Sequence, residues 1–264
     1  MSMHIIDKAR QSFECTQLSV AAYGHINAQY VGCARRLSTY GRIAGIPRAI
    51  DLFPKVRRSD WLDRIRAEAG TFLQDLTAGI LPPHNQGRTN YCWAHGSVRA
   101  VEMSRIFTGQ VPLLLSAESV AVPVTGGRNR GGSPDEALQR LRSHGACPAD
   151  MWPANDLNQR HATANWETAA SDNAIITWCD IRDWEDQITL GFHRIPVPIG
   201  LGWWSHLVCQ LGPIELPGEK VGICFDNSHG PDYGENGRAI LDEESGTADL
   251  GAFAPVSDTH ARTL

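Results

Sequence analysis

The stretch Gln86-Gly87-Arg88-Thr89-Asn90-Tyr91-Cys92-Trp93 decides how this chain is interpreted. A Gln-Gly turn lies shortly before a cysteine, and helical periodicity begins at Cys92 and runs to about Phe107, with Gly109 as a suitable C-cap. A helix N-terminus carries about half a positive charge, which favours the thiolate of a cysteine over the thiol. The Gln86 carboxamide and the Cys92 backbone N–H can then both point at a developing oxyanion. The stretch predicts a nucleophile.

The partners that such a nucleophile needs follow later in the chain. His206 begins one apolar run, and Asn227 follows the end of another, within Phe225-Asp226-Asn227-Ser228-His229-Gly230. A cysteine, a histidine and an asparagine that are remote in sequence and adjacent in space form a thiol-nucleophile triad. In such a triad His206 takes the thiol proton, and the Asn227 carbonyl orients the imidazole.

At these residues the chain resembles the papain-like cysteine peptidases. That family has Gln-Gly-x-Cys-Gly-Ser-Cys-Trp-Ala-Phe around its nucleophile and Asn-Ser-Trp-Gly-x-x-Trp-Gly around its asparagine, and this chain has Gln86 to His95 and Asn227 to Gly234. Leu115-Ser116-Ala117-Glu118 and the pair Gly131-Gly132 lie between them, as in the family. The resemblance covers roughly residues 80 to 256. It implies that Cys92 is the nucleophile, His206 the general base, Asn227 its orienter and Gln86 the oxyanion donor.

The resemblance also implies a substrate site and a fold. Gly131 and Gly132 would lie along the wall that pairs with a peptide backbone, and Trp204 would line the leaving-group side. For Gly131 and Gly132 a simple turn, and for Trp204 core packing, remain open. The implied fold is α+β with two lobes: a helical lobe carrying the nucleophile helix, an antiparallel sheet or barrel, and the active site in the cleft between them. The chemistry needs neither a cofactor nor a metal.

Four positions depart from the family pattern. Thr89 and Asn129 stand where the family has the two cysteines of one disulfide, and their joint replacement favours a reducing compartment. His229 and Tyr233 stand where it has two tryptophans, the first of which shields the histidine–asparagine hydrogen bond. We therefore expect a less firmly oriented histidine with an unchanged fold.

Composition fits a globular protein. The chain has 264 residues, 42% of them hydrophobic, and the sequence contains no apolar run of about 18 residues, so no membrane partner is expected. The N-terminus lacks the apolar core of a signal peptide, and seven cysteines without compact spacing indicate mostly reduced, buried thiols. We expect a cytoplasmic or virion-associated protein. A zinc site from His206, Cys209 and Cys224 is a weak alternative, because no Cys-x-x-Cys pair supports it.

Charge is divided unevenly along the chain. Residues 1–58 hold nine Lys/Arg and three Asp/Glu, and the remainder holds fifteen and twenty-six. This basic arm can dock on a protein partner or an anionic surface, or on its own acidic body; nucleic acid is not expected. We divide the chain into an N-terminal extension (1–80), which resembles a pro-segment only in its position, and a peptidase domain (81–264).

Periodicity predicts helices first and strands later. The expected helices are 59–76, 92–107 and 133–144, and the expected strands are 174–178, 195–201, 206–211, 220–225 and 238–241. The functional prediction is a cysteine peptidase acting on a peptide or protein substrate. The alternatives are a catalytically weak or inactive module that docks through its cleft or basic arm, and related acyl transfer such as deamidation or transglutamination.

Overall fold

The computed structural model describes residues 6, 46–250 and 252–256, and most of the basic arm lies outside them. Within the described part, short helices come first: α2 (Ala49–Leu52), α3 (Trp61–Ala67) and α4 (Leu73–Leu76), with a 3-10 turn at Arg58–Asp60. Four helices follow: α5 (Cys92–Phe107), α6 (Glu118–Thr125), α7 (Pro134–His144) and α8 (Trp166–Ser171), with 3-10 turns at Ala149–Met151 and Gln159–His161.

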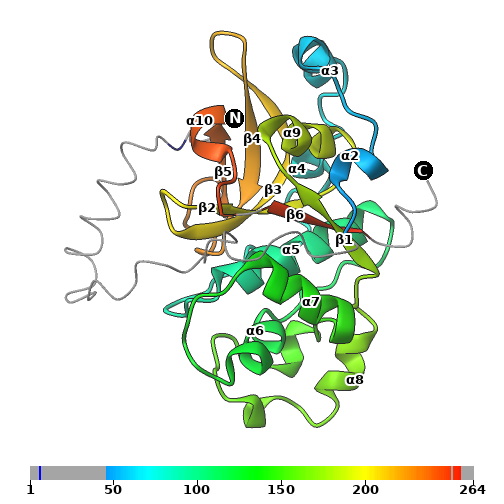
Figure 1. Ribbon diagram of the computed structural model, residues 1–264. Coiled ribbons are helices and arrows are strands. Elements are labelled where there is room, and N and C mark those ends of the chain that lie inside the picture. The colour runs from blue at the N-terminus through cyan, green and yellow to red at the C-terminus, as the bar shows by residue number, and fades with distance from the viewer. Residues whose placement is uncertain (1–5, 7–45, 251, 257–264) are drawn as a thin grey trace.

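The sheet is formed by the last third of the chain. Its strands are β1 (Thr177–Ile181), β2 (Val197–Leu201), β3 (His206–Leu216), β4 (Lys220–Asp226), β5 (Arg238–Asp242) and β6 (Ala252–Val256), with α9 (Trp184–Phe192) and α10 (Glu243–Gly246) between them. The strand order is β1-β6-β2-β3-β4-β5, and every pair is antiparallel. Figure 1 shows α6, α7 and α8 in one half of the molecule and the sheet in the other, with α5 between them. The predicted α+β class is confirmed.

One predicted helix is split in the structure, and α9 and β6 were not predicted. The helix expected over 59–76 is split into α3 and α4, because the chain turns at Gly70, whose φ of +82° is left-handed. Helix α9 lies in a region where only strands were predicted, and it begins where the Asp183 side chain accepts a hydrogen bond from the Asp186 N–H. Strand β6 was not predicted, yet it joins β1 to β2 within the sheet.

Other predictions match closely. Helix α5 spans 92–107, and α7 starts with Pro134 at its first position and a capping box in which Glu136 accepts from the Ser133 N–H at 2.9 Å. The strands expected at 206, 220 and 238 begin at those residues, although β3 continues to Leu216.

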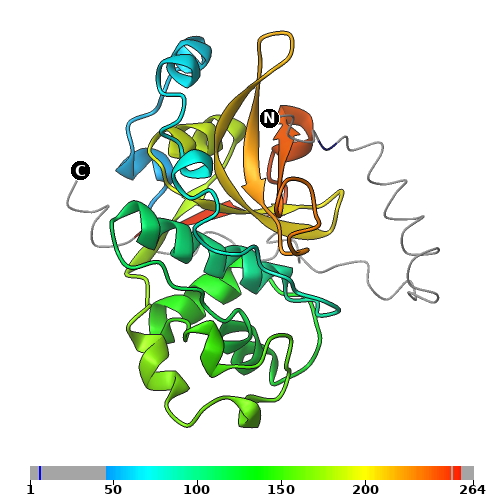
Figure 2. The same ribbon diagram turned by 180° about the vertical axis from the view of Figure 1, so that it is seen from behind.

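Residues 46–76 pack with the sheet. Phe53, Val56, Trp61, Ile65 and Phe72 belong to the same buried cluster as the inner faces of β2, β3 and β4. Both views place α2, α3 and α4 beside the sheet half, away from α6 and α8 (Figures 1 and 2). The division at residue 80 stays a prediction.

The contact between α5 and β3 positions the site. Gly96 of α5 faces Leu207 and Val208 of β3 so closely that a Cβ at residue 96 would overlap the Leu207 Cδ2 atom and lie 3.4 Å from the Val208 carbonyl carbon. Glycine therefore lets the helix approach the strand at this distance without a shift of the Leu207 side chain. The crossing brings the start of α5 and the start of β3 toward one another.

Candidate active site

Cys92 is the first residue of α5 and follows a tight turn. The Thr89 backbone N–H and hydroxyl both donate to the Gln86 carbonyl, at 2.9 and 2.8 Å, which closes the turn ahead of the helix. Tyr91, Cys92 and Trp93 each have 0% exposure. The helix N-terminus is therefore placed as predicted, and the cysteine is enclosed by protein.

His206 and Asn227 lie side by side because β3 and β4 are antiparallel. His206 is the first residue of β3, and Asn227 follows the last residue of β4. His206 Nε2 lies 2.7 Å from Asn227 Oδ1, and the two residues are only 4% and 3% exposed. The predicted pair is thus brought together and removed from water.

The donor in this pair can be assigned from the backbone. The Ser228 N–H donates to Asn227 Oδ1 at 2.8 Å, and because an N–H cannot accept, the Asn227 atom in this bond is its oxygen. His206 Nε2 must then carry the proton that it shares with that oxygen. The other ring nitrogen, Nδ1, is left as the basic atom of the neutral imidazole.

Burial keeps His206 neutral. Burial and, to a smaller extent, the nearby His229 ring lower the pKa of His206, the hydrogen bond with Asn227 raises it, and the net result is a pKa of about 3. A neutral imidazole can accept a proton, as a general base must.

Gln86 is oriented by two hydrogen bonds. Its Nε2 donates to the Thr89 carbonyl at 2.8 Å, and its Oε1 accepts from the Ser228 hydroxyl at 2.6 Å. An NH₂ group has two N–H donors, so the second N–H of Gln86 Nε2, which makes no hydrogen bond among the described residues, can donate to another acceptor. Sequence reasoning missed Ser228, although its place directly after Asn227 was the available signal.

The three predicted substrate-binding residues occupy different surroundings. Gly131 and Gly132 are buried, and a Cβ on Gly132 would lie 2.5 Å from the indole of Trp93. Trp204 lies in the turn before β3, with its ring centroid 4.8 Å from that of His206. Ser205 has a φ of +50°, which folds the turn back toward the strand. Whether these residues contact a substrate stays a prediction.

Asn129 links the segments that a disulfide joins in the resembled family. Its Oδ1 accepts from the Asn90 N–H at 2.6 Å, and its Nδ2 donates to the Arg88 carbonyl at 3.1 Å. The loop before Cys92 is thus held by hydrogen bonds to Asn129.

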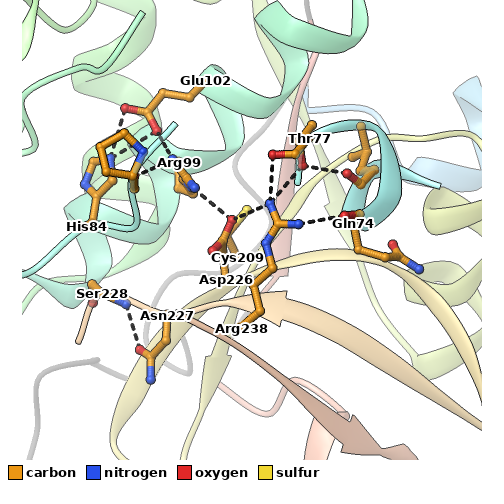
Figure 3. Close-up of polar contacts among 12 residues, drawn as sticks. Gln74, Thr77, His84, Arg99, Glu102, Cys209, Asp226, Asn227, Ser228 and Arg238 are labelled. Atoms are coloured by element: carbon orange, nitrogen blue, oxygen red, sulfur yellow. Dashed lines mark hydrogen bonds and ion pairs between the residues drawn. The ribbon is translucent and has the colours of Figure 1, made fainter. Parts of the chain in front are cut away.

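A buried ion network lies beside Asn227 (Figure 3). Arg99 of α5 pairs with Asp226 and with Glu102, both at 2.9 Å, and Arg238 of β5 approaches Asp226 at 3.5 Å. His84 Nε2 lies 2.9 Å from Glu102. The network connects α5 to the residue that precedes Asn227.

The weak zinc alternative finds no support in the described residues. They contain no cluster of three or more His, Cys, Asp or Glu side chains arranged to hold a metal. Cys209 and Cys224 belong to an apolar cluster with Leu73, Met103 and Leu211. Within the same part of the chain, five cysteines are thiols that form no disulfide: Cys92, Cys147, Cys179, Cys209 and Cys224. None of the helices in the described part of the chain has the length and apolar character of a membrane span.

Solved structures similar to this chain are cysteine proteases, whereas no protein-family model and no curated relative matches it. The proform of Amb a 11, a ragweed pollen allergen, has a TM-score of 0.63 at 16% identity, over 95% of this chain and 86% of that one. Bromelain from Ananas comosus, in complex with E64, has a TM-score of 0.57 at 16% identity, over 71% and 98%. Digestive procathepsin L 3 of Tenebrio molitor has a TM-score of 0.56 at 16% identity, and the match spans 67% of this chain and 66% of that chain.

Proposed function

Because this chain has the papain-like cysteine protease fold, we propose that it is a thiol-dependent peptidase with Cys92 as nucleophile, His206 as general base, Asn227 as orienter and Gln86 as oxyanion donor. One observation carries the proposal: the Nε2–H of His206 donates to Asn227 Oδ1 at 2.7 Å. This bond leaves Nδ1 of a buried, neutral imidazole as the proton acceptor.

Packing of α5 on β3 supports a contact between Cys92 and His206. Residues four apart on a helix share one face, so Cys92 lies on the face through which Gly96 touches Leu207 and Val208. His206 directly precedes Leu207 in β3. Moving one turn back along α5, from Gly96 to Cys92, therefore leads toward the start of β3.

The reaction follows from these positions. His206 Nδ1 takes the Cys92 thiol proton, Sγ bonds to the peptide carbonyl carbon, and the oxyanion is held by the Cys92 N–H and the second N–H of Gln86 Nε2. Collapse breaks the C–N bond, and His206 gives its proton to the leaving amine. Water then attacks the thioester carbon while His206 takes its proton, collapse breaks the C–S bond, and His206 returns the proton to Sγ, which releases the carboxylic acid and restores the thiol. The positive end of α5 favours the thiolate at the start of this sequence.

The substrate class is a peptide or protein. The E64 complex of bromelain and the E-64 complex of the Carica candamarcensis protease CMS1MS2 are the ligand-bound neighbours that motivate this assignment. Because Cys92 has 0% exposure, a substrate carbonyl must displace covering atoms to reach Sγ. A role for the basic arm in docking a partner, and a cytoplasmic or virion-associated location, remain predictions.

Labelling and turnover test the proposal together. E-64 and iodoacetamide should modify Cys92 faster than Cys147, which is equally buried and whose pKa is raised by burial. Turnover of a mixed peptide library should disappear in Cys92→Ala and persist in Cys147→Ala. Equal labelling rates at the two thiols, or equal turnover by wild type and Cys92→Ala, would contradict the proposal that Cys92 is a catalytic nucleophile.

A second function is favoured by the enclosure of Cys92. In a catalytically inactive module the same fold would serve for docking. Cys92, which has 0% exposure, would then not need to become accessible to a substrate. A folded wild-type chain that neither cleaves peptides nor reacts with E-64 at Cys92 would support this module. Product analysis by mass spectrometry would distinguish hydrolysis from deamidation or transglutamination.

A further inference from the structure

His229 contacts both members of the His206–Asn227 pair. Its Nδ1 lies 3.3 Å from Asn227 Nδ2, and its ring centroid lies 4.7 Å from that of His206, with the planes 30° apart. It stands where the resembled family has a tryptophan. A tryptophan has no acceptor atom that could receive a hydrogen bond from the Asn227 amide, whereas a histidine has one.

The direction of the Asn227–His229 hydrogen bond follows from the Ser228 N–H. Because Ser228 and His206 both donate to Asn227 Oδ1, the other end of the carboxamide is the NH₂ group. That group can only donate, so Nδ1 of His229 must be unprotonated to accept it. The single ring proton of neutral His229 then lies on Nε2.

We propose that neutral His229 is a positioning residue: it holds the Asn227 carboxamide with its oxygen toward His206. A proton on Nδ1 of His229 would face the NH₂ group of Asn227, and the amide would have to turn or move away. Either change takes the oxygen away from His206 Nε2–H, and the imidazole loses its orientation. The inference rests on the proposed function, because the orientation of His206 matters only if it acts on Cys92.

His229 is surrounded by aromatic rings and by other histidines. The aromatic rings of Trp204, from the turn before β3, and Tyr233, from the segment after β4, pack against it with centroids 6.2 and 5.6 Å away. The titratable groups around it are His206 on β3, His95 on α5, and His84 next to Asn85, which forms a β-bridge with His229. Asp226 precedes Asn227 and is already paired with Arg99 and Arg238. No salt bridge within the described residues includes His229.

The environment of the His229 ring determines the pH at which this residue becomes protonated. Burial lowers the pKa of His229 to about 4, but the residue also keeps an exposed side, which moderates the cost of charging it. We expect His229 to become protonated near pH 4 and activity to be lost as the pH falls toward that value.

Two substitutions test separately whether the site needs the hydrogen-bond acceptor of His229 and whether it depends on the titration of His229. His229→Phe keeps a ring but removes the acceptor, and His229→Asn keeps an acceptor near the Nδ1 position and does not titrate. We expect His229→Phe to lower kcat by roughly tenfold or more while KM changes less than twofold, because orientation of the base is lost. His229→Asn should keep kcat within about threefold and extend activity to lower pH. A His229→Phe variant with the wild-type kcat and pH profile would overturn the proposal.

A spectroscopic measurement keeps this test independent of turnover. In ¹⁵N NMR spectra of the full chain, His229 should carry its proton on Nε2 at pH 7. The side-chain NH₂ signals of Asn227 should shift with the titration of His229 and should lose that response in His229→Phe. If the Asn227 signals follow the titration of His229 in a chain that shows no peptide turnover, the proposed peptidase function is wrong but the His229–Asn227 hydrogen bond is supported. A proton on Nδ1 of His229 at pH 7, or Asn227 signals that ignore its titration, would reject the contact itself.

Discussion

Arg99 of α5 forms a buried ion pair with Asp226, the residue immediately before Asn227, with 2.9 Å between Arg99 Nε and Asp226 Oδ2. Their side chains are 5% and 1% exposed. Arg99 lies about two helical turns after Cys92, so the pair connects the helix of the proposed nucleophile to the strand of its proposed orienter. Glu102 shares the same guanidinium through Nη1.

Removal of Arg99 should destabilise the fold strongly. Arg99→Met removes the guanidinium that the buried carboxylates of Asp226 and Glu102 share, and leaves Asp226 only the longer contact with Arg238 at 3.5 Å. Breaking a buried ion pair costs about 3–5 kcal/mol. Urea unfolding at pH 7 measures the loss. The control is Arg58→Met, because Arg58 pairs with Glu243 where both side chains are about half exposed, at 55% and 43%. That change should cost less than about 1 kcal/mol, and similar losses in the two variants would contradict the structural role of the pair.

Gly96 should control the geometry of the site. In Gly96→Val the added atoms collide with Leu207 and Val208, which pushes α5 away from β3 and costs about 1–3 kcal/mol. We expect the rate of Cys92 modification by E-64 to fall at a pH and temperature where the variant stays folded. Gly109→Ala is the matched control: its φ of +76° makes alanine strained, but nothing lies within 4 Å of the new Cβ. A comparable loss of Cys92 reactivity in Gly109→Ala would attribute the effect to stability alone.

His95 should reduce stability in acid. Burial, followed by the nearby His84, His206 and His229, lowers the pKa of His95 well below 6.5, and the residue is only 4% exposed. In the unfolded chain this histidine binds a proton near pH 6.5, so the unfolded state holds more protons and the free energy of unfolding decreases as the pH falls below 6.5. In His95→Phe the slope of unfolding free energy against pH, between pH 6.5 and 5, should be smaller by up to about 1.4 kcal/mol per pH unit. Above pH 7.5 the slopes should coincide, and a difference there would assign the effect to another group.

Trp204 should shield His206 from water. Because burial is the main cause that lowers the pKa of His206 to about 3, Trp204→Ala should raise that pKa toward 6.5. More of the imidazole is then protonated at pH 5, where it can no longer accept the thiol proton. The ¹⁵N titration of His206 reports the shift. Trp203→Ala, which removes a ring stacked on Trp204 at 5.4 Å, should shift the pKa less, and an unchanged His206 titration in Trp204→Ala would refute the shielding.

Local signals in the sequence were sufficient for several elements. The capping box of Ser133 and Glu136, and the periodicity after Cys92, placed α7 and α5 correctly because both depend on residues three or four apart. The split between α3 and α4 and the inclusion of β6 were not predictable in this way. A left-handed Gly70 and a strand that lies between β1 and β2 depend on which segments the chain packs against.

The same distinction applies within the site. Residue types and their order along the chain were sufficient to nominate Cys92, His206, Asn227 and Gln86, and to identify His229 and Asn129 as departures from a family pattern. Only the tertiary structure decided that His229 Nδ1 lies 3.3 Å from Asn227 Nδ2, that the Ser228 hydroxyl donates to Gln86, and that Cys92 is enclosed. Hydrogen bonds require donor and acceptor within about 3 Å and at a suitable angle. Between residues as far apart as Gln86 and Ser228, that distance is set by how α5 packs against β3 and β4, which no local pattern encodes.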